Sequence, residues 1–361
     1  MIYNTSEGIL IAVYFITLYL TTFWLLVLFD KELKIKKKLT DFPLFSIIIP
    51  AWNEEETITE TLTSLKNLDY PKDKLEIIVV NDGSEDNTQI LTEDFIKKNP
   101  SFNIKLINQP KNLGKGRALN TGLKYIKGEF FACLDADSFV TPDSIKLILP
   151  YFDSLDIGAV CPLMKVKEPK TLLQKVQWYE YIINMFYKHL NAKLDCVHVT
   201  PGPFSTYKTN IIKKIGGYDE STITEDLELA LRLQKNQYKI VQAMDAQVYT
   251  TAPKDLKGVF NQRLRWYRGS CYNTYKYKKL MFNKKYGDFG FIRMPTIVLS
   301  GMIAIVMLIL ISYDTTRLLK KWLLYLISIN FNVTPFLINP TINLTILNLN
   351  YLKIFMGLTL L

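Results

Sequence analysis

The stretch Leu44-Phe-Ser-Ile-Ile-Ile-Pro50 decides the fold, because a short, continuous apolar run of this kind predicts a buried β-strand. A helix is predicted over residues 54–68, and Leu75-Glu-Ile-Ile-Val-Val80 is the next predicted strand. Strands that alternate with helices predict an α/β fold, with a mainly parallel sheet flanked by helices on both faces. Functional residues are then expected beyond the C-terminal ends of the strands.

The same alternation continues to about residue 163, and after Pro162 the character of the sequence changes. Residues 171–190 predict an aromatic-rich amphipathic helix, which fits either an ordinary core helix or a helix in the bilayer interface. The other predicted elements are helices at 87–98, 115–126, 209–215, 224–236 and 257–280, and strands at 104–107 and 129–134.

Apolar segments at both ends of the chain are long enough to cross a bilayer core of ~30 Å as helices. Gly8–Phe29 is uncharged, and the lysines at 31–38 predict a cytoplasmic flank with the N-terminus outside. Met294–Tyr313 is a second such run, and Trp322–Leu352 predicts a span followed by a broken one. A linker carrying Arg317, Lys320 and Lys321 is expected between them, facing outward by simple alternation although the positive-inside rule opposes this.

Composition supports a membrane protein with a large soluble region. The 361 residues are 48% hydrophobic and have a mean hydropathy of +0.07, which is high for a soluble protein. The net charge of +10 lies mostly beside the apolar runs, which favours anionic lipid over nucleic acid as a partner. Predicted domains are a transmembrane helix (8–29), a nucleotide-sugar-binding half (31–165), an acceptor-binding half with interface helices (166–290) and a transmembrane region (291–361).

Cysteine and histidine show no metal-ligand spacing. The four cysteines, at 133, 161, 196 and 271, are expected to be free thiols in a cytoplasmic region. His189 and His198 are expected to be structural. Any metal site must therefore use carboxylates.

A first acidic cluster follows the second predicted strand, in Asn81-Asp-Gly-Ser-Glu-Asp-Asn87. By itself this segment predicts a turn, since its residues are turn formers. Asp82 nevertheless stands at the end of a buried strand, where it could accept a hydrogen bond from a nucleotide base.

A second cluster is Phe130-Phe-Ala-Cys-Leu-Asp135-Ala-Asp137. On an extended segment Asp135 and Asp137 project to the same side and could face one cation, or a cation and a sugar. Oxygen ligands suit Mg²⁺ or Mn²⁺, and Mg²⁺ commonly combines one or two carboxylates with substrate phosphates. This interpretation is favoured over that of solvated surface acids, because a cation would relieve the repulsion between the two carboxylates.

Two later motifs are ambiguous by themselves. Thr224-Glu225-Asp226 opens a predicted helix, where Thr224 could be an N-cap and the acids could simply face the helix dipole. If Asp226 faces a cleft, it could accept the proton of an acceptor hydroxyl. Gln262-Arg-Leu-Arg265-Trp266 fits a basic interfacial helix, and equally a diphosphate grip by arginine with Trp266 against a sugar ring.

The order of these motifs resembles the processive members of glycosyltransferase family 2, which include cellulose, chitin, hyaluronan and poly-N-acetylglucosamine synthases. Four further segments match, and the resemblance covers about residues 44–270: Pro50-Ala-Trp-Asn-Glu54-Glu, Asn112-Leu-Gly-Lys115-Gly-Arg-Ala-Leu-Asn120, Pro201-Gly-Pro-Phe204 and Gly216-Gly-Tyr-Asp219. It implies a GT-A fold and an inverting, single-displacement transfer from a UDP-sugar.

The resemblance also implies roles for individual residues. Glu54, Asp82, Lys115, Asp135 and Arg265 would hold the nucleotide sugar, and Asp137 would coordinate Mg²⁺ or Mn²⁺. Asp226 would be the general base. Phe204, Glu225, Gln262 and Trp266 would line the acceptor's path.

Two rival functions remain at this stage. One is a non-processive enzyme that adds a single sugar to a lipid acceptor, and the other is an inactive sensor or scaffold that binds a nucleotide sugar. Long-chain synthases commonly have more membrane helices after the arginine-tryptophan motif than this sequence offers. The polymer could pass through few helices, an oligomer or accessory subunit could complete the path, or the sequence could be truncated.

Overall fold

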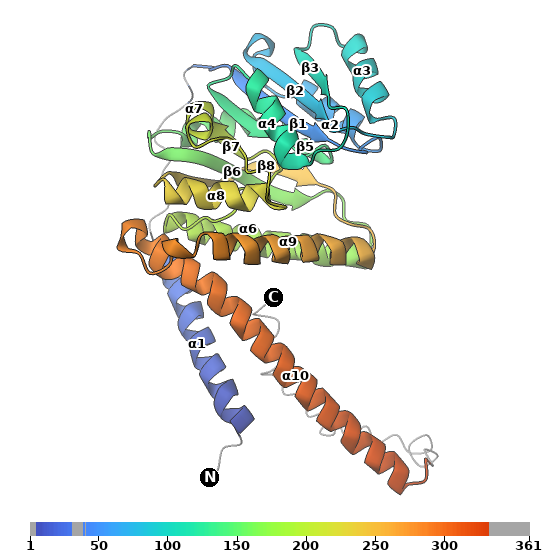
Figure 1. The fold of residues 1–361 in the computed structure, drawn as a ribbon, viewed down its shortest axis with the longest axis vertical. Helices are drawn as coiled ribbons and strands as arrows, with labels where there is room; N and C mark the ends of the chain where they lie inside the picture. The colour runs from blue at the N-terminus through green and yellow to red at the C-terminus, as the bar shows by residue number, and fades with distance from the viewer. Residues whose placement is uncertain (1–4, 31–38, 40, 332–361) are drawn as a thin grey trace. The chain divides into compact units, whose positions relative to one another are not determined.

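The computed structural model describes residues 5–30, 39 and 41–331. It separates into two compact units, one formed by Asp30–Met294 and the other by the terminal segments Met1–Phe29 and Pro295–Leu361. The first unit is an α/β domain built on one eight-stranded sheet with the strand order β3-β2-β1-β4-β7-β6-β8-β5 (Figure 1). The division at residue 165 into two functional halves remains a prediction.

The secondary structure of this domain follows the predicted alternation closely up to residue 133. The strands are β1 (Phe45–Ala51), β2 (Leu75–Asn81), β3 (Ile104–Asn108), β4 (Phe130–Cys133), β5 (Ser138–Val140), β6 (Ile157–Val166), β7 (Thr206–Lys208) and β8 (Lys239–Thr250). The α-helices are α2 (Ile58–Lys66), α3 (Thr88–Lys98), α4 (Lys115–Tyr125), α5 (Ser144–Ile148), α6 (Leu172–Lys193), α7 (Thr209–Lys214), α8 (Glu225–Lys235) and α9 (Leu256–Lys276). Short 3-10 and π turns lie at 72–74, 149–151, 278–280, 284–286 and 289–293.

β1 is buried on both faces, which explains why its sequence is continuously apolar. Ile47 and Ile49 belong to a core cluster with Leu62 of α2, on one face of the sheet. Ile48 belongs to a second cluster with Leu119 of α4, on the other face. Helices therefore cover both faces, as the strand-helix alternation predicts.

Strand direction divides the sheet into two parts. β3, β2, β1 and β4 are all parallel, as predicted, whereas β7 pairs antiparallel with both β4 and β6, and β5 pairs antiparallel with β8. The sheet is therefore mixed. Strands β5 to β8 were not predicted. β5 and β7 have only three residues each, and polar residues interrupt the apolar pattern of β8.

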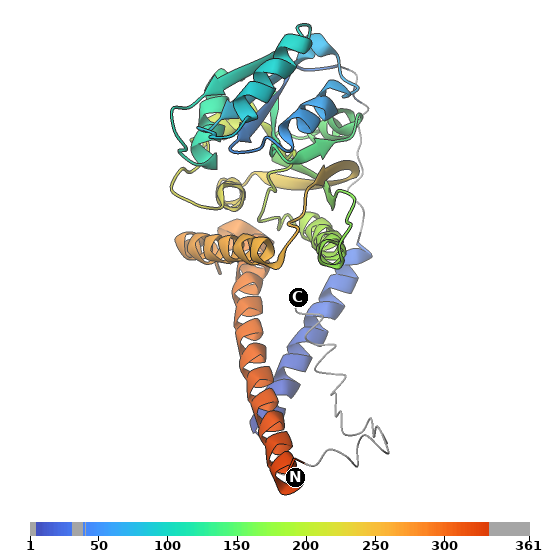
Figure 2. The same ribbon diagram turned by 90° about the vertical axis from the view of Figure 1, so that its right-hand side faces the viewer.

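Helices α6 and α9 form a layer of their own at one end of this domain (Figures 1 and 2). An ion pair between Arg263 of α9 and Glu180 of α6 joins them, with 2.5 Å between Nη2 and Oε2. Both helices leave large apolar side chains exposed, among them Tyr179 of α6 and Phe260 of α9. This exposure favours the interface interpretation of the aromatic-rich helix over that of a core helix.

The terminal unit contains α1 (Thr5–Leu28) and α10 (Met294–Ser328), which contact each other through Val13, Ile303 and Met307. Both helices are long and apolar enough to cross a bilayer, judged by length and composition. The linker predicted between Tyr313 and Trp322 is wrong, because α10 continues through it without a break. The rest of the predicted C-terminal span, and the lysines at 31–38, lie outside the described residues.

Candidate active site

The frame of the site is a pair of loops at the C-terminal ends of β1 and β2. The backbone N–H of Asn53 donates to Ser84 Oγ at 3.1 Å, and the side-chain oxygen of Asn53 accepts from the Glu85 N–H at 2.9 Å. The backbone N–H of Glu54 donates to Thr88 Oγ1 at 2.8 Å. Since polar residues of one loop satisfy the backbone of the other, the two loops form one rigid edge.

Asp82 is buried at this edge and holds a third loop. Its Oδ1 accepts the N–H of Leu113 and its Oδ2 the N–H of Gly114, both at 2.9 Å. Gly83 follows with φ of +68°, and a Cβ there would lie 2.4 Å from the carbonyl carbon of Lys111. Asp82 thus anchors the loop that leads into α4. Its carboxylate oxygens keep further lone pairs that can accept hydrogen bonds from a nucleotide.

An open cleft of about 670 Å³ lies beside these loops, within the size range of small-molecule sites. Two predicted ligand residues, Glu54 and Asp137, line it together with Gln262 of α9. The remaining lining residues are Asn53, Glu55, Glu56, Thr57, Glu85, Asp86, Thr251, Ala252, Pro253 and Lys254.

Two carboxyl groups in the cleft are poorly stabilised in their charged form. Burial, and then the charge of Asp137, raises the pKa of Glu54 to about 7. Burial, and then the charge of Asp135, raises the pKa of Asp137 to about 6. Among the residues that the structure describes, neither has a basic side chain within ion-pair distance, so a bound cation would stabilise both as carboxylates.

Asp135 and Asp137 do not lie on an extended segment, so the predicted same-side geometry is wrong. β4 ends at Cys133 and the two acids lie in the turn before β5, where the Ser138 N–H donates to the Asp135 carbonyl at 3.0 Å. The turn lets them diverge. Asp137 lines the cleft and accepts from Ser138 Oγ at 3.0 Å, while Asp135 faces Lys115.

Lys115, at the first position of α4, joins two acidic motifs that are far apart in the sequence. Its Nζ lies 2.6 Å from Asp135 Oδ1 and 3.0 Å from Glu225 Oε1. Burial would lower the pKa of Lys115, but Asp135 and Glu225 raise it well above its usual value. Glu225 is therefore paired with Lys115 and buried, and the structure does not present it to an acceptor on its own.

Gly202 closes over this ion-pair cluster. A Cβ at residue 202 would lie 2.5 Å from Asp135 Oδ2 and 2.8 Å from Lys115 Nζ. Only a residue without a side chain allows such a close approach. We name Lys115, Asp135, Glu225 and Gly202 the lysine knot.

Asp226 lies next to the lysine knot at the start of α8. Burial, and then the charge of Glu225, raises its pKa to about 6, while Lys115 and the N–H of Leu227 oppose the rise. Asp135 contributes to the raised pKa of both Asp226 and Asp137. The charge of Asp135 therefore affects both the predicted base and the predicted metal ligand.

The position of Asp226 depends on contacts with α9. The Asn273 side-chain amide donates to Thr224 Oγ1 at 3.0 Å and to Thr222 Oγ1 at 3.1 Å. A Cβ at Gly269 would lie 2.2 Å from Thr224 Oγ1, so the helix can approach only because residue 269 is glycine. Thr224 does not use its hydroxyl as an N-cap, contrary to the simpler interpretation of this motif.

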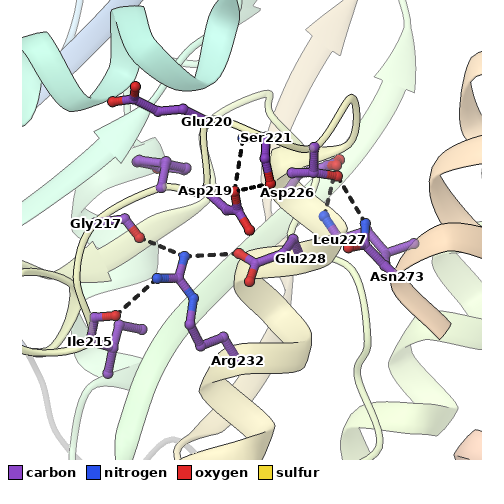
Figure 3. A network of polar contacts seen from close by, with 12 residues as sticks. Ile215, Gly217, Asp219, Glu220, Ser221, Asp226, Leu227, Glu228, Arg232 and Asn273 are labelled. Carbon is purple, nitrogen blue, oxygen red and sulfur yellow. Dashed lines mark hydrogen bonds and ion pairs between the residues drawn. The ribbon is translucent and has the colours of Figure 1, made fainter. Parts of the chain in front are cut away.

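A second network holds α8 to the loop before it (Figure 3). Arg232 donates to the carbonyls of Ile215 and Gly217 at 2.9 and 2.6 Å, and it pairs with buried Glu228 at 2.8 Å. Asp219 accepts from the backbone and hydroxyl of Ser221 in the same loop. This network joins α8 to the loop before it and uses none of the predicted site residues.

Within the motif at residues 262–266, Trp266 is packed against other side chains, whereas Arg265 is exposed. Trp266 packs against Val166, Tyr181 and Ala252, and the Arg263 guanidinium lies 4.2 Å from the centre of its ring. Arg265 is exposed, on the same helical face as Gln262 three residues earlier. Neither Arg265 nor Trp266 is among the cleft-lining residues.

The prediction that Phe204 contacts the acceptor is wrong for its side chain. Phe204 is fully buried, its ring lies 6.2 Å from that of Phe45, and its N–H donates to the Cys133 carbonyl. Its φ is +58°, and the residue of this motif that contacts Asp135 and Lys115 is Gly202. The motif matters here through its backbone.

The donor set fits a divalent ion that takes part of its coordination from a substrate. Within residues 5–30, 39 and 41–331, no group of three or more His, Cys, Asp or Glu side chains is arranged around a common point. Asp137 is nevertheless a cleft-facing carboxylate with a raised pKa, and it forms no ion pair with the described residues. Mg²⁺ bound to one carboxylate and a diphosphate needs no larger protein cage.

Several residues of the site were not singled out from the sequence. Gly202 lies in a segment that was noted only for its resemblance, and Asn273 and Gly269 gave no signal because a helix pattern does not show which positions touch another element. The segment Thr251–Lys254, which lines the cleft, directly follows β8, and this strand was not predicted.

Comparison with known proteins agrees with this arrangement. Residues 46–216 match the model of glycosyl transferase family 2. Poly-beta-1,6-N-acetyl-D-glucosamine synthase of Staphylococcus epidermidis is 32% identical over 244 residues, covering 67% of this chain and 58% of that protein. The probable glycosyltransferase YdaM of Bacillus subtilis is 34% identical over 259 residues, covering 70% and 61%. The chain spans about three fifths of the length of these relatives.

A solved structure shows the same fold. The mannosyltransferase of Pyrobaculum calidifontis, in complex with GDP-mannose and Mn²⁺, superposes with a TM-score of 0.65 at 22% identity, covering 76% of this chain and 75% of that one. This likeness supports the predicted GT-A-type architecture. The sequence matches show that residues 46–216 are a glycosyl transferase family 2 domain.

Proposed function

We propose that the protein transfers a sugar from a UDP-sugar to a hydroxyl of a growing polysaccharide, with inversion in a single displacement. The observation that supports this proposal is the pair of contacts of Lys115, whose Nζ lies 2.6 Å from Asp135 and 3.0 Å from Glu225. The acidic motif that contains the proposed metal ligand and the one that contains the proposed base therefore meet at one lysine.

On the donor side, Asp82 and the paired loops bind the nucleotide and Asp137 holds the metal ion. Mg²⁺ or Mn²⁺, when bound, neutralises charge on the diphosphate as the sugar leaves it. Lys115 keeps Asp135 fixed where it can contact the sugar. Arg265 is exposed without an ion-pair partner among the described residues, so it is available to the departing diphosphate.

On the acceptor side, Asp226 accepts the proton of the attacking hydroxyl. Its raised pKa of about 6 makes it a stronger base than an ordinary aspartate while leaving it ionised near neutral pH. Gln262 and Trp266 are proposed to guide the acceptor from α9. Glu225 then acts indirectly, by holding Lys115 in place through their ion pair.

Polysaccharide as the acceptor is supported by the Staphylococcus relatives, which are poly-N-acetylglucosamine synthases by name. Membrane association is supported by α1 and α10 and by the exposed aromatic side chains of α6 and α9. We propose that the catalytic domain is cytoplasmic and the N-terminus outside, because basic residues flank the first apolar helix on its domain side. Translocation of the product across the membrane is part of the proposal.

The test is a transfer assay with the purified full chain in nanodiscs, individual UDP-sugars and Mg²⁺ or Mn²⁺. A ladder of saccharides by mass spectrometry, absent when the ion is chelated, is expected. A single glycolipid product would indicate that the protein transfers one sugar to a lipid and does not synthesise a polymer. Absence of both transfer and UDP release with every UDP-sugar would refute the proposed function.

A further inference from the structure

Two segments that are far apart in the sequence line the cleft. One is the segment 53–57, which follows β1, and the other is the segment 251–254, which follows β8. We name the second segment the β8 wall. Its last residue, Lys254, is the one basic side chain among the cleft-lining residues of the described chain.

Hydrogen bonds at two points fix the backbone of the β8 wall. Thr251 Oγ1 donates to the Asp137 carbonyl at 3.3 Å, so the wall begins beside the proposed metal ligand. Gln177 of α6 is only 2% exposed, and its Nε2 donates to the Pro253 carbonyl at 3.0 Å. Since Pro253 directly precedes Lys254, the lysine extends from a backbone whose position the fold sets.

The charge of the cleft is unfavourable for a nucleoside diphosphate. Six carboxyl groups line it, those of Glu54, Glu55, Glu56, Glu85, Asp86 and Asp137. A nucleoside diphosphate is also negatively charged, so its entry brings like charges together. One divalent ion beside Asp137 offsets only part of this repulsion. A second cation in the cleft is therefore favoured, and Lys254 is the lining residue that supplies one.

Lys254 forms an ion pair with the other lining segment. Its Nζ lies 3.6 Å from Oε2 of Glu56, and the two side chains are 76% and 82% exposed. An ion pair with this exposure contributes little to stability, and it would form equally on a surface that binds nothing. The pair alone therefore does not indicate function. It does mean that Lys254 can exchange Glu56 for a more highly charged partner at little cost.

We propose that Lys254 is a donor-binding residue, whose ammonium leaves Glu56 and contacts the diphosphate of the nucleotide sugar. Lysine suits this contact because its ammonium is a compact charge on a flexible stem and can follow a phosphate oxygen. The inference rests on the proposed function, because it takes the cleft to be the site of a nucleoside diphosphate and a divalent ion.

The test measures the affinity of the full chain in nanodiscs for UDP, by calorimetry, and for uridine, by nuclear magnetic resonance, both with Mn²⁺ present. Lys254→Gln should weaken UDP binding roughly 5- to 20-fold, because a charge-assisted hydrogen bond is lost. Uridine lacks the diphosphate, so its affinity should change less than about twofold. In the transfer assay the donor KM should rise while kcat stays the same, since the contact is present before and during the reaction.

Two further variants separate a direct contact from a general effect of charge. Lys257→Gln removes the same charge from an exposed position outside the cleft, and UDP affinity should change less than about twofold. Lys254→Arg retains a cation at the wall and should keep most of the affinity for UDP.

Glu56→Gln removes the partner that competes for Lys254, so it should strengthen UDP binding by about 2- to 5-fold. This change is opposite in sign to that of Lys254→Gln. If the ion pair only held the two segments together, both variants would weaken UDP binding alike. Thermal unfolding should show equal Tm for both variants and the unchanged protein, because the pair is exposed.

The proposal is overturned if Lys254→Gln binds UDP as the unchanged protein does, if Lys257→Gln weakens UDP binding equally, or if uridine loses affinity in step with UDP. Failure of the proposed function is seen in a different sample, the unchanged protein, which would then bind no UDP and transfer no sugar. The two failures can therefore be told apart.

Discussion

The carboxylates at the sheet edge fall into two groups. Asp82, Asp135 and Glu225 are held by groups of the protein itself, namely backbone N–H groups and the Lys115 ammonium. Glu54, Asp137 and Asp226 have no cationic side chain within ion-pair distance among the described residues, and burial raises the pKa of each. The first group shapes the site, and we expect the second group to meet ligands.

The contrast has a physical origin. A buried carboxylate that receives several hydrogen bonds or a counter-charge loses little by being ionised, whereas one without them is destabilised in its charged form. Strongly perturbed carboxyl groups in a cleft are candidates for metal binding and proton transfer. Substitutions in the two groups should therefore fail in different ways, and the predictions that follow test this.

The largest effect is expected for Asp226→Asn. An amide cannot accept the proton of the acceptor hydroxyl, so transfer should fall by about 10²–10⁴-fold or more. UDP binding, measured by calorimetry, should stay within a few-fold of that of the unchanged protein. Product formation at the original rate would remove Asp226 from the role of base.

Asp137→Asn should lower transfer by roughly 10²–10³-fold, because stabilisation of the leaving diphosphate by the ion is worth several kcal/mol. Unlike the change at Asp226, it should also weaken the Mn²⁺ dependence of UDP binding. Asp73→Asn, a change of the same kind at an exposed position outside the cleft, is the matched control. Unaltered metal dependence would place the ion elsewhere.

Gly202→Ala tests the first group of carboxylates, because Gly202 packs against Asp135 and Lys115. The added methyl would meet Asp135 and Lys115, so we expect a loss of about 1–3 kcal/mol of stability and a fall in activity of roughly 10-fold or more as the lysine knot shifts. Gly301→Ala, where nothing lies within 4 Å of the added atom, should change neither. Thermal unfolding and the transfer assay measure both, and a fully active, stable Gly202→Ala would show that the knot is not tightly packed.

The pH dependence of kcat tests the second group of carboxylates, through Asp226. A raised pKa means that Asp226 takes up its proton at a higher pH, so the base is present above about 6 and is lost below it. At saturating donor and metal, kcat should fall about tenfold for each pH unit below about 6. The matching profile of Asp226→Asn should lack this limb. A flat profile in the unchanged protein down to pH of about 4 would mean that another group takes the proton.

The smallest effect is expected for Asn273→Ala, which removes two buried hydrogen bonds from the Thr222 and Thr224 hydroxyls. Stability should drop by about 1–3 kcal/mol, with only a few-fold loss of kcat, because Asn273 supports the start of α8 without contacting the reaction. Cys271→Ala, at an exposed position of the same helix, is the control. Equal stability of the two variants would contradict this supporting role.

Local sequence patterns predicted the part of the fold that is made of regular, parallel units. The apolar run in Phe45–Ala51 and the amphipathic runs of α2 to α4 have strong periodicity, and they form the elements expected of them. β7 and β8 were missed because a short or half-polar strand is stabilised mainly by its neighbours in the sheet. The unbroken α10 was missed because charged residues can continue a helix as easily as they end a span.

Among the site residues, the sequence identified most of the carboxylates but not what each one contacts. Their spacing predicted that Asp135 and Asp137 project to the same side, yet a turn sends one to Lys115 and the other into the cleft. Phe204 was assigned to the acceptor from its motif, and burial shows that it belongs to the core.

The sequence by itself determined which chemical groups this protein has and the order in which they follow the strands. It also determined the parallel half of the sheet. Both follow from hydrophobic periodicity and motif spacing, which are local properties of the chain. The tertiary structure alone decided which carboxylates have a counter-charge and which have a raised pKa, since that depends on burial and on side chains far apart in the sequence, such as Lys115 and Glu225.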